Sequence, residues 1–174
     1  FYFCRDFFAA HTNNVINYCE SHDEHSVPYE VATAGAELSG EAAKERKSRL
    51  GLFATVVALG QPMIYMGQEF GVERPRNRID LNWRKLAEKN HYYEWAKRLL
   101  SLRRRYPGLR IYGYNPVEEG KFSWLIGPWF DEARGGGRRV IGWATRPGDA
   151  PWEEMTVLLN FEPFPVTVNL QFPR

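Results

Sequence analysis

An apolar run that passes directly into ionisable side chains constrains this sequence more than any other feature. Residues 14–19 alternate as in a β-strand, with Val15, Asn17 and Cys19 on one face and Ile16 and Tyr18 on the other. The strand should end at a polar cluster made of Glu20, Ser21, His22, Asp23, Glu24 and His25. A buried strand that leads into acids and histidines at its carboxyl end is the usual placement of catalytic groups in α/β barrels. The alternative is a solvated turn after a strand.

A helix and a second apolar run follow at the spacing of one βαβ unit. We expect the helix to begin near Ser39 as its N-cap, with Glu41 in the first turn, and to end at Gly60. Its predicted core face consists of Leu50, Phe53, Ala54, Val57 and Ala58. Residues 61–66 predict a second strand, parallel to the first. Because this strand ends in Gly-Gln-Glu-Phe-Gly, residues 67–71, both polar clusters should meet at one edge of the sheet.

The segments around this unit predict loops and a second helix. Residues 1–13 are typical of the tail of a helix or a loop, and residues 26–38 predict a mixed loop. Residues 72–88 are rich in Arg, Asn and Pro and predict another loop. A helix over about 90–106 should then end at Pro107-Gly108. Its buried stripe is expected to consist of Tyr92, Trp95, Leu99 and Leu102.

From residue 109 the pattern changes to short β-type runs separated by turn signals. The expected strands are residues 109–114, 121–126, 138–145, 155–160 and 165–171. In the last run, Val166, Val168 and Leu170 alternate with polar residues, as in a half-exposed antiparallel strand. The sequence therefore predicts a small all-β domain that follows an α/β region.

Length and composition agree with this division. A chain of 174 residues fits one domain or two small ones, and we place the boundary between residues 1–107 and 108–174. Hydrophobic content of 44% and aromatic content of 15% support a packed core and argue against disorder. A net charge of +2 without a basic stripe gives no nucleic-acid footprint. The nearest basic cluster, Arg103-Arg104-Arg105, closes the second helix and suits the negative end of its dipole.

Targeting signals and cysteines bear on the compartment. No apolar run approaches the roughly 20 residues that span a bilayer, so we expect no membrane partner. The sequence shows no signal peptide and begins at Phe1 without a Met, which suggests a piece of something longer. Cys4 and Cys19 are the only cysteines. Because Cys19 lies in a predicted strand, a free buried thiol is favoured over a disulfide, which fits a cytoplasmic protein.

Three motifs resemble a known family. Residues 17–23, Asn-Tyr-Cys-Glu-Ser-His-Asp, resemble the last conserved sequence region of the α-amylase superfamily, glycoside hydrolase family 13, at the end of its seventh barrel strand. Residues 61–71 resemble the family's eighth strand and the loop after it, and Asp80-Leu81-Asn82-Trp83 is similar to the motif before its eighth helix. The Glu-Ser-His-Asp and Gly-x-Glu-Phe-Gly forms resemble the branching-enzyme and maltosyltransferase side of the family. The β-region after Gly108 lies where members have their all-β C-terminal domain.

The resemblance implies a fold and an activity. The fold is the C-terminal portion of a TIM (β/α)8 barrel, strands 7 and 8 with their helices, followed by a small antiparallel β-sandwich. The activity is hydrolysis or transglycosylation of α-glucans by a retaining mechanism, which needs a nucleophile and an acid/base about 5 Å apart. In this family both come from the fourth and fifth strands, and neither segment occurs in the sequence. Two strands cannot close a barrel. We therefore expect the chain to be inactive alone and to associate with the rest of its barrel or with itself.

The resemblance also assigns roles at the first strand end. Asp23 matches the family's third carboxylate, which binds the 2- and 3-hydroxyls of the sugar being cleaved and stabilises the transition state. His22 matches the neighbouring histidine, which donates to the same sugar. The residue types suit this chemistry, because positive charge develops on the ring in the transition state and an imidazole supplies directional donors.

Other residues at this edge take further roles in the same scheme. Glu24 and Glu69 are assigned to substrate binding, although holding loops together is the favoured role of Glu69. Tyr65 and Trp83 fit either stacking on sugar faces or packing in the core. No cofactor and no metal ion are implied. The alternative function is a non-catalytic carbohydrate-binding or scaffold relative of the amylase barrel, such as the ancillary subunits of amino-acid transporters. The intact pair of His22 and Asp23 favours the enzyme.

Overall fold

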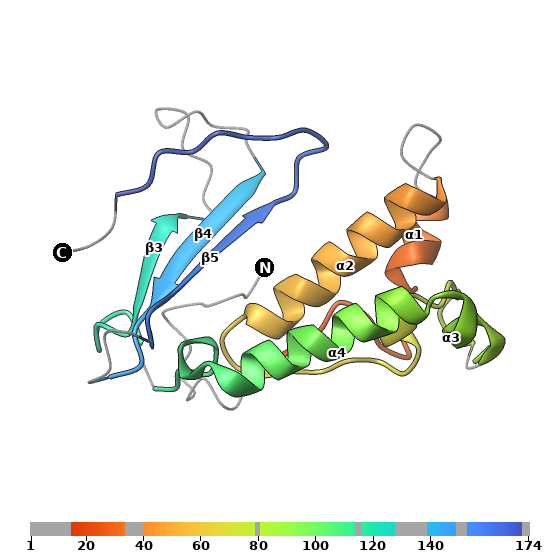
Figure 1. Ribbon diagram of the computed structural model, residues 1–174, viewed down its shortest axis with the longest axis horizontal. Helices are drawn as coiled ribbons and strands as arrows, with labels where there is room; N and C mark the ends of the chain where they lie inside the picture. The colour runs from red at the N-terminus through yellow and green to blue at the C-terminus, as the bar shows by residue number, and fades with distance from the viewer. Residues whose placement is uncertain are drawn as a thin grey trace.

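Helices and a three-stranded sheet lie side by side in the computed structural model (Figure 1). The structure describes residues 15–33, 40–78, 81–113, 116–127, 139–148 and 153–171. The helices are α1 (Val27–Thr33), α2 (Glu41–Val57), α3 (Arg84–Glu88) and α4 (Asn90–Arg105), with 3-10 turns η3 (Gln68–Phe70) and η4 (Pro107–Leu109). The strands are β1 (Ile16–Asn17), β2 (Gln61–Pro62), β3 (Phe122–Ile126), β4 (Val140–Thr145) and β5 (Met155–Asn160). The predictions for residues 1–13, Cys4, Ser39 and Asp80 concern residues outside these ranges.

The predicted parallel pairing of the first two strands is confirmed. Ile16 lies opposite Gln61 and Asn17 opposite Pro62, with α2 as the connection between the strands. Both strands are two residues long, shorter than predicted. The N–H groups of Gln61 and Met63, on either side of Pro62, donate to the carbonyls of Val15 and Asn17, and the Asn17 side chain donates to the Leu59 carbonyl.

The segment before α2 was predicted as a loop, which is wrong, because it contains the helix α1. Two side chains cap its first turn. The Ser26 hydroxyl accepts the N–H of Tyr29 at 3.4 Å, and Glu20 Oε1 accepts the N–H of Val27 at 2.9 Å. Pro28 is in the first turn, where its missing N–H removes no helical hydrogen bond. A residue taken as a loop signal is therefore compatible with a helix start.

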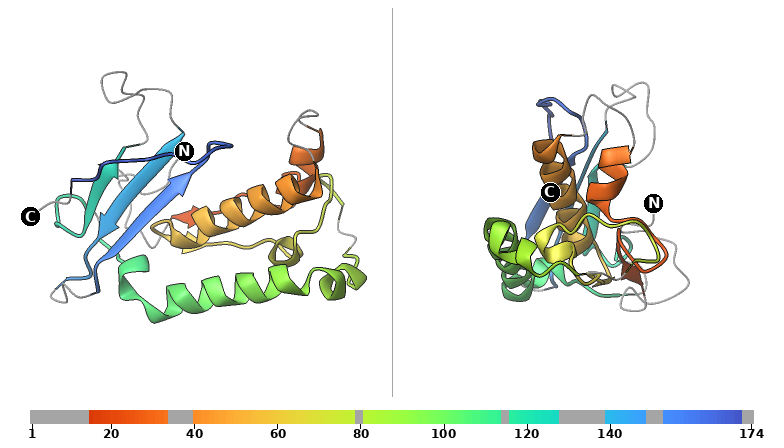
Figure 2. Two further views of the ribbon diagram at one scale, coloured as in Figure 1. Left: turned by 45° about the horizontal axis from the view of Figure 1, so that its top comes forward. Right: turned by 90° about the vertical axis from the view of Figure 1, so that its right-hand side faces the viewer.

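The two longer helices, α2 and α4, are confirmed, and they pack against each other. The N-cap of α2 is Gly40 and not Ser39, with no side-chain capping bond. The helix is buried on two sides and not on one face alone, since Leu52 and Val56 face α4 while Ala54 and Val57 face the sheet. Figure 2 shows α2 and α4 side by side, with the chain after β2 passing between them.

A buried arginine links the ends of these helices. Arg103 lies in the last turn of α4 with Arg104 and Arg105, as predicted. Its guanidinium, however, donates to the carbonyls of Val56, Ala58 and Gly60 at the end of α2, the one to Ala58 at 3.0 Å. The last carbonyls of a helix have no partner within the helix. Arg103 therefore caps the neighbouring helix, whereas Arg104 and Arg105 are exposed.

The sheet is antiparallel in the order β3-β4-β5, which confirms three of the five predicted strands. Residues 109–113, the described part of the predicted strand 109–114, do not form a strand, because Leu109 belongs to η4 and, with Ile111, packs into the core instead of pairing. Residues 165–171 are not a strand either. Their side chains still alternate between half-buried and exposed, as predicted, so the pattern reported burial and not strand pairing.

One apolar cluster crosses the predicted domain boundary at residue 107. It joins the end of α2 to one face of the sheet, and it consists of Ala54, Val57, Leu59, Leu109, Ile111, Phe122, Ile141, Trp143, Val157 and Leu159. The sheet of three strands and its helical cover thus share a core in the described ranges. The division into residues 1–107 and 108–174 remains a prediction. Within the same ranges, no helix has the length and apolar character needed to cross a membrane.

Candidate functional site

The bend after β1 presents His22 and Asp23 to solvent. His22 Nε2 lies 3.1 Å from Asp23 Oδ2, and the two side chains are 76% and 73% exposed. The backbone N–H of Asp23 donates to Ser21 Oγ at 3.2 Å. Both side chains thus project from the end of a strand into open space, where a ligand can reach them.

The loop after β2 lies against this bend, as the predicted meeting of the two strand ends requires. Gln68 Nε2 donates to Cys19 Sγ at 2.9 Å, and the N–H of Asn77 donates to the His22 carbonyl at 3.3 Å. Cys19 is a free thiol, and burial raises its pKa above the ordinary value. The parallel pairing of two-residue strands is sufficient to bring these loops together.

Arg74, which is only 4% exposed, contacts both ends of the bend. Its guanidinium donates to the Ser21 carbonyl at 2.8 Å and to the Glu24 carbonyl at 3.5 Å, and it lies 4.2 Å from the centre of the Tyr65 ring. The backbone of Arg74 also exchanges two hydrogen bonds with Ser26. Sequence reasoning missed Arg74, because nothing in an Arg-rich loop distinguishes it from its exposed neighbours. Tyr65, predicted to stack on sugar or to pack in the core, lies beneath this guanidinium.

Glu20 is a buried carboxyl group directly below the bend. It is 2% exposed, and burial raises its pKa from 4.5 to about 7. The hydrogen bond from the Val27 N–H and the charge of Arg74 act in the opposite direction, and the charge of Glu69 raises the pKa further. Burial therefore favours the protonated form of this group relative to an exposed glutamate.

The Glu69 carboxylate contacts the backbone of its own turn. Among the described contacts, none joins Glu69 to His22 or Asp23. Its Oε2 accepts the N–H of Gly67 at 2.8 Å. It also lines a groove of about 270 Å³ along α4 together with Tyr93, Ala96, Lys97, Leu100, Ser101 and Arg104. This geometry agrees with the favoured loop-holding role. Its assignment to substrate binding remains a prediction.

The other predicted residues differ in exposure. Glu24 is exposed, and its carbonyl accepts from Arg74. Trp83 is 58% exposed, with its ring centre 5.8 Å from that of Phe70, so it is not a core residue. No group of three His, Cys, Asp or Glu side chains in the described ranges could hold a metal ion.

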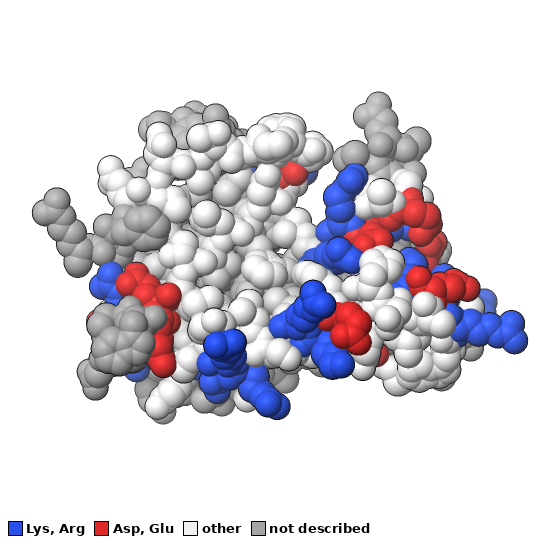
Figure 3. All heavy atoms as spheres, viewed as in Figure 1, with Lys and Arg blue, Asp and Glu red and all other residues white. Residues whose placement is uncertain are grey.

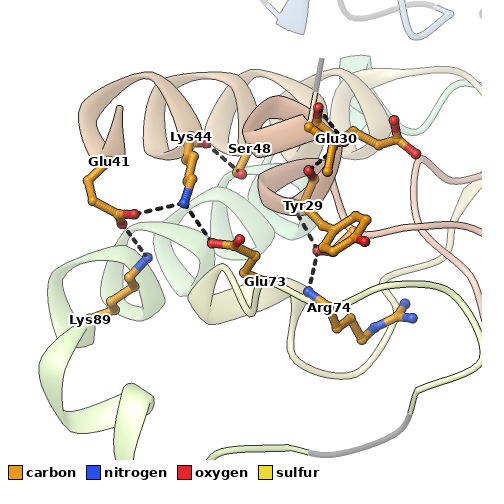
Figure 4. Close-up of polar contacts among 10 residues, drawn as sticks. Tyr29, Glu30, Glu41, Lys44, Ser48, Glu73, Arg74 and Lys89 are labelled. Carbon is orange, nitrogen blue, oxygen red and sulfur yellow. Dashed lines mark hydrogen bonds and ion pairs between the residues drawn. The ribbon is translucent and has the colours of Figure 1, made fainter. Parts of the chain in front are cut away.

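An ion-pair network fixes the loop that contains Arg74. Lys44 Nζ lies 2.9 Å from Glu41 Oε1 and 2.8 Å from Glu73 Oε2, and Lys89 Nζ lies 3.8 Å from Glu41 Oε2 (Figure 4). The network joins the start of α2, the loop before Arg74 and the start of α4. Figure 3 shows acidic and basic side chains intermixed over the helical half, without a one-sided basic patch on that face.

Comparison with known proteins identifies the relatives of this chain. No family model matches it. The pullulanase of Bacillus subtilis strain 168 is 30% identical over 105 residues, which cover 55% of this chain and 14% of that protein. The chain is thus homologous to a pullulanase over these 105 residues. This confirms the expected resemblance to the α-amylase superfamily, whereas the resemblance to its branching enzymes and maltosyltransferases remains a prediction.

Solved pullulanase structures share the fold. The apo pullulanase of Paenibacillus barengoltzii matches with a TM-score of 0.71 and 22% identity, over 90% of this chain and 24% of that one. Its complex with maltohexaose and α-cyclodextrin matches with a TM-score of 0.70 and 24% identity, over the same shares of 90% and 24%. The pullulanase of Bacillus acidopullulyticus matches with a TM-score of 0.65 and 15% identity, over 85% and 18%. The chain thus spans less than a quarter of these enzymes, as the chain shares of 24%, 24% and 18% show.

Proposed function

We propose that this chain is the C-terminal part of an α-glucan-acting enzyme of the amylase type. In this proposal, β1 and β2 are the seventh and eighth strands of a (β/α)8 barrel, and the sheet of β3, β4 and β5 belongs to a C-terminal β-sandwich. One observation supports the assignment above the others. His22 and Asp23 lie exposed after the carboxyl end of a strand, and a buried arginine in the loop after the next strand holds their backbone. Catalytic groups of α/β barrels occupy this edge.

The chemistry that we propose for the site is stabilisation of an oxocarbenium-like transition state. Asp23 accepts hydrogen bonds from two sugar hydroxyls, and its negative charge opposes the positive charge that develops on the ring. His22 donates to the same sugar, and its contact with Asp23 orients both groups. We assign Glu24 to substrate binding at the rim of the bend. Glu69 takes part in binding only through the loop that it holds.

The nucleophile and the acid/base are proposed to come from polypeptide outside this sequence, because neither of the family's two segments occurs within it. We therefore expect the purified 174-residue chain to release no reducing sugar from pullulan or amylose and to leave iodine staining of starch unchanged. The complete protein that contains the chain, assayed in parallel, should be active. Hydrolysis by the chain alone would contradict the assignment. A complete protein that binds maltotetraose without turnover would support the non-catalytic alternative.

We also propose that the β1–β2 pair associates with the remaining barrel or with another copy of the chain. Ile16, Tyr18 and Met66 are 60%, 49% and 53% exposed, and they lie at or just beyond short strands. Unpaired strand edges with apolar side chains favour association. Light scattering of the isolated chain should show species larger than a monomer at micromolar concentration. A monodisperse monomer with a cooperative melt across dilution would contradict this expectation.

We further propose that the ligand of the complete protein is an α-glucan and that the protein is cytoplasmic. Relatives of known structure were solved with maltotetraose and with maltose, which supports an α-glucan as the ligand here. A free thiol at Cys19 supports a cytoplasmic location. Product analysis of the complete protein on amylose and pullulan separates hydrolysis from branching or transfer.

A further inference from the structure

We propose that Arg74 is a positioning residue that sets the geometry of the His22–Asp23 bend for sugar binding. This proposal rests on the proposed function, because it gives Arg74 a role only through the groups that contact the sugar. Arg74 itself lies below the bend with 4% of its surface exposed, so it does not have to touch the ligand.

The bend needs such support, because its two functional side chains receive little from packing. They are 76% and 73% exposed, and their contact in the described part of the chain is with each other. The backbone around them is bent and is not part of a regular ladder. What holds the bend is therefore a set of hydrogen bonds to its backbone, from Ser21 to Ser26.

Arg74 makes four hydrogen bonds to this segment, more than any other described residue. The guanidinium donates to the carbonyl before the pair, Ser21, and to the carbonyl after it, Glu24. The main chain of Arg74 donates to Ser26 Oγ at 2.8 Å and accepts the Ser26 N–H at 3.0 Å. One residue thus spans the bend from both ends and ties it to the loop after β2. The bond from the charged guanidinium to the buried Ser21 carbonyl, at 2.8 Å, is the strong one of the two, and the contact with the Glu24 carbonyl, at 3.5 Å, is weaker.

The shape of the side chain matters as much as its charge. A guanidinium donates in two directions from one plane and stacks on an aromatic ring, and here that ring is Tyr65, 4.2 Å away. A lysine ammonium would keep the charge, but it is not planar. It could not donate to both carbonyls and also stack on the Tyr65 ring. The substitution Arg74→Lys therefore tests geometry separately from charge.

The experiment measures kcat, KM and melting temperature on maltooligosaccharide or pullulan in the complete protein that contains the chain. Arg74→Lys should lower kcat/KM by about ten- to a hundredfold, because displacement of catalytic groups by about 1 Å has effects of that size. The matched control is Arg76→Lys, the same substitution two residues along the loop at an exposed side chain. Its kcat/KM should stay within about twofold of the parent.

A double-mutant cycle separates positioning from general structure. If Arg74 acts through Asp23, Arg74→Lys should lower kcat/KM by less than about threefold in an Asp23→Asn background, so the two losses are not additive. Equal losses in both backgrounds, or no loss in the parent, would overturn the positioning role. An Asp23→Asn protein with parental kinetics would instead overturn the proposed function itself.

If the Arg74→Lys protein does not fold, the variant Tyr65→Leu replaces it. This variant should lower kcat/KM by a smaller factor, and that loss should also disappear in the Asp23→Asn background.

Discussion

Replacing Asp23 by Asn in the complete enzyme should lower kcat by about 30- to 900-fold, which corresponds to roughly 2–4 kcal/mol of lost transition-state stabilisation. Asparagine keeps the shape and part of the hydrogen bonding but removes the negative charge. Because that charge matters most when the sugar ring becomes positive, the loss should fall on kcat more than on KM. Folding stability should change little, since the Asp23 side chain is 73% exposed.

Two further variants serve as comparisons for Asp23→Asn: one changes the neighbouring site residue and the other is a control. His22→Asn should be milder and should weaken both binding and turnover, because the shorter amide does not place its donors where the imidazole N–H lies, while the Asp23 carboxylate is unchanged. Glu30→Gln neutralises an exposed acid on α1 and should leave kcat and KM unchanged. If Asp23 were only structural, the Asp23→Asn protein would show a lowered melting temperature with near-normal kinetics in the folded fraction. Turnover within about threefold of the parent, roughly 0.7 kcal/mol, would remove Asp23 from the site.

The sequence predicted those elements whose pattern depends on local periodicity. The helix α4 follows from apolar residues at helical spacing that end at Pro107. The alternation around β1 correctly separated Ile16 and Tyr18, which are exposed, from Asn17, which is buried. The helix α1 was missed because one of its caps, Glu20, comes from the strand end before it. Residues 165–171 were predicted as a strand because alternation records which side chains are covered. It does not record whether the backbone has a partner strand.

The candidate site divides in the same way. His22 and Asp23 stand next to each other, so a short motif was enough to single them out. Arg74 is more than fifty positions away from Ser21, and its contact with the bend exists only because β1 and β2 pair in parallel. Likewise, Arg103 caps α2 and not its own helix because the two helices lie together. Arg74 and Arg103 act on segments that are distant in sequence and close only in the folded chain. A single sequence has no local pattern that marks such residues.

Glu20→Gln should change how the stability of the chain depends on pH, by about 3 kcal/mol between pH 4.5 and pH 8. The folded state holds the Glu20 proton with a pKa of about 7, whereas the ordinary value is 4.5. Below the lower value both states are protonated, so ionisation of Glu20 contributes nothing. As the pH rises through this window the unfolded state loses its proton first, and the free energy of unfolding of the parent falls. Above pH 7 the loss is complete and the curve is flat with respect to this group.

The measurement compares denaturant unfolding of the parent and the Glu20→Gln chain at several pH values across this window. Glutamine keeps an oxygen to accept the Val27 N–H and cannot ionise, so its stability should not contain this decline. The other ionisable groups are the same in both proteins, so subtraction of the two curves removes their contributions. The difference should grow in favour of glutamine as the pH rises. A difference that stays constant to within about 0.5 kcal/mol would mean that Glu20 is already ionised in the folded state well below pH 7. In that case, the charge of Arg74 would outweigh the burial of Glu20, and the support under the bend would be an ion pair instead of a neutral carboxyl group.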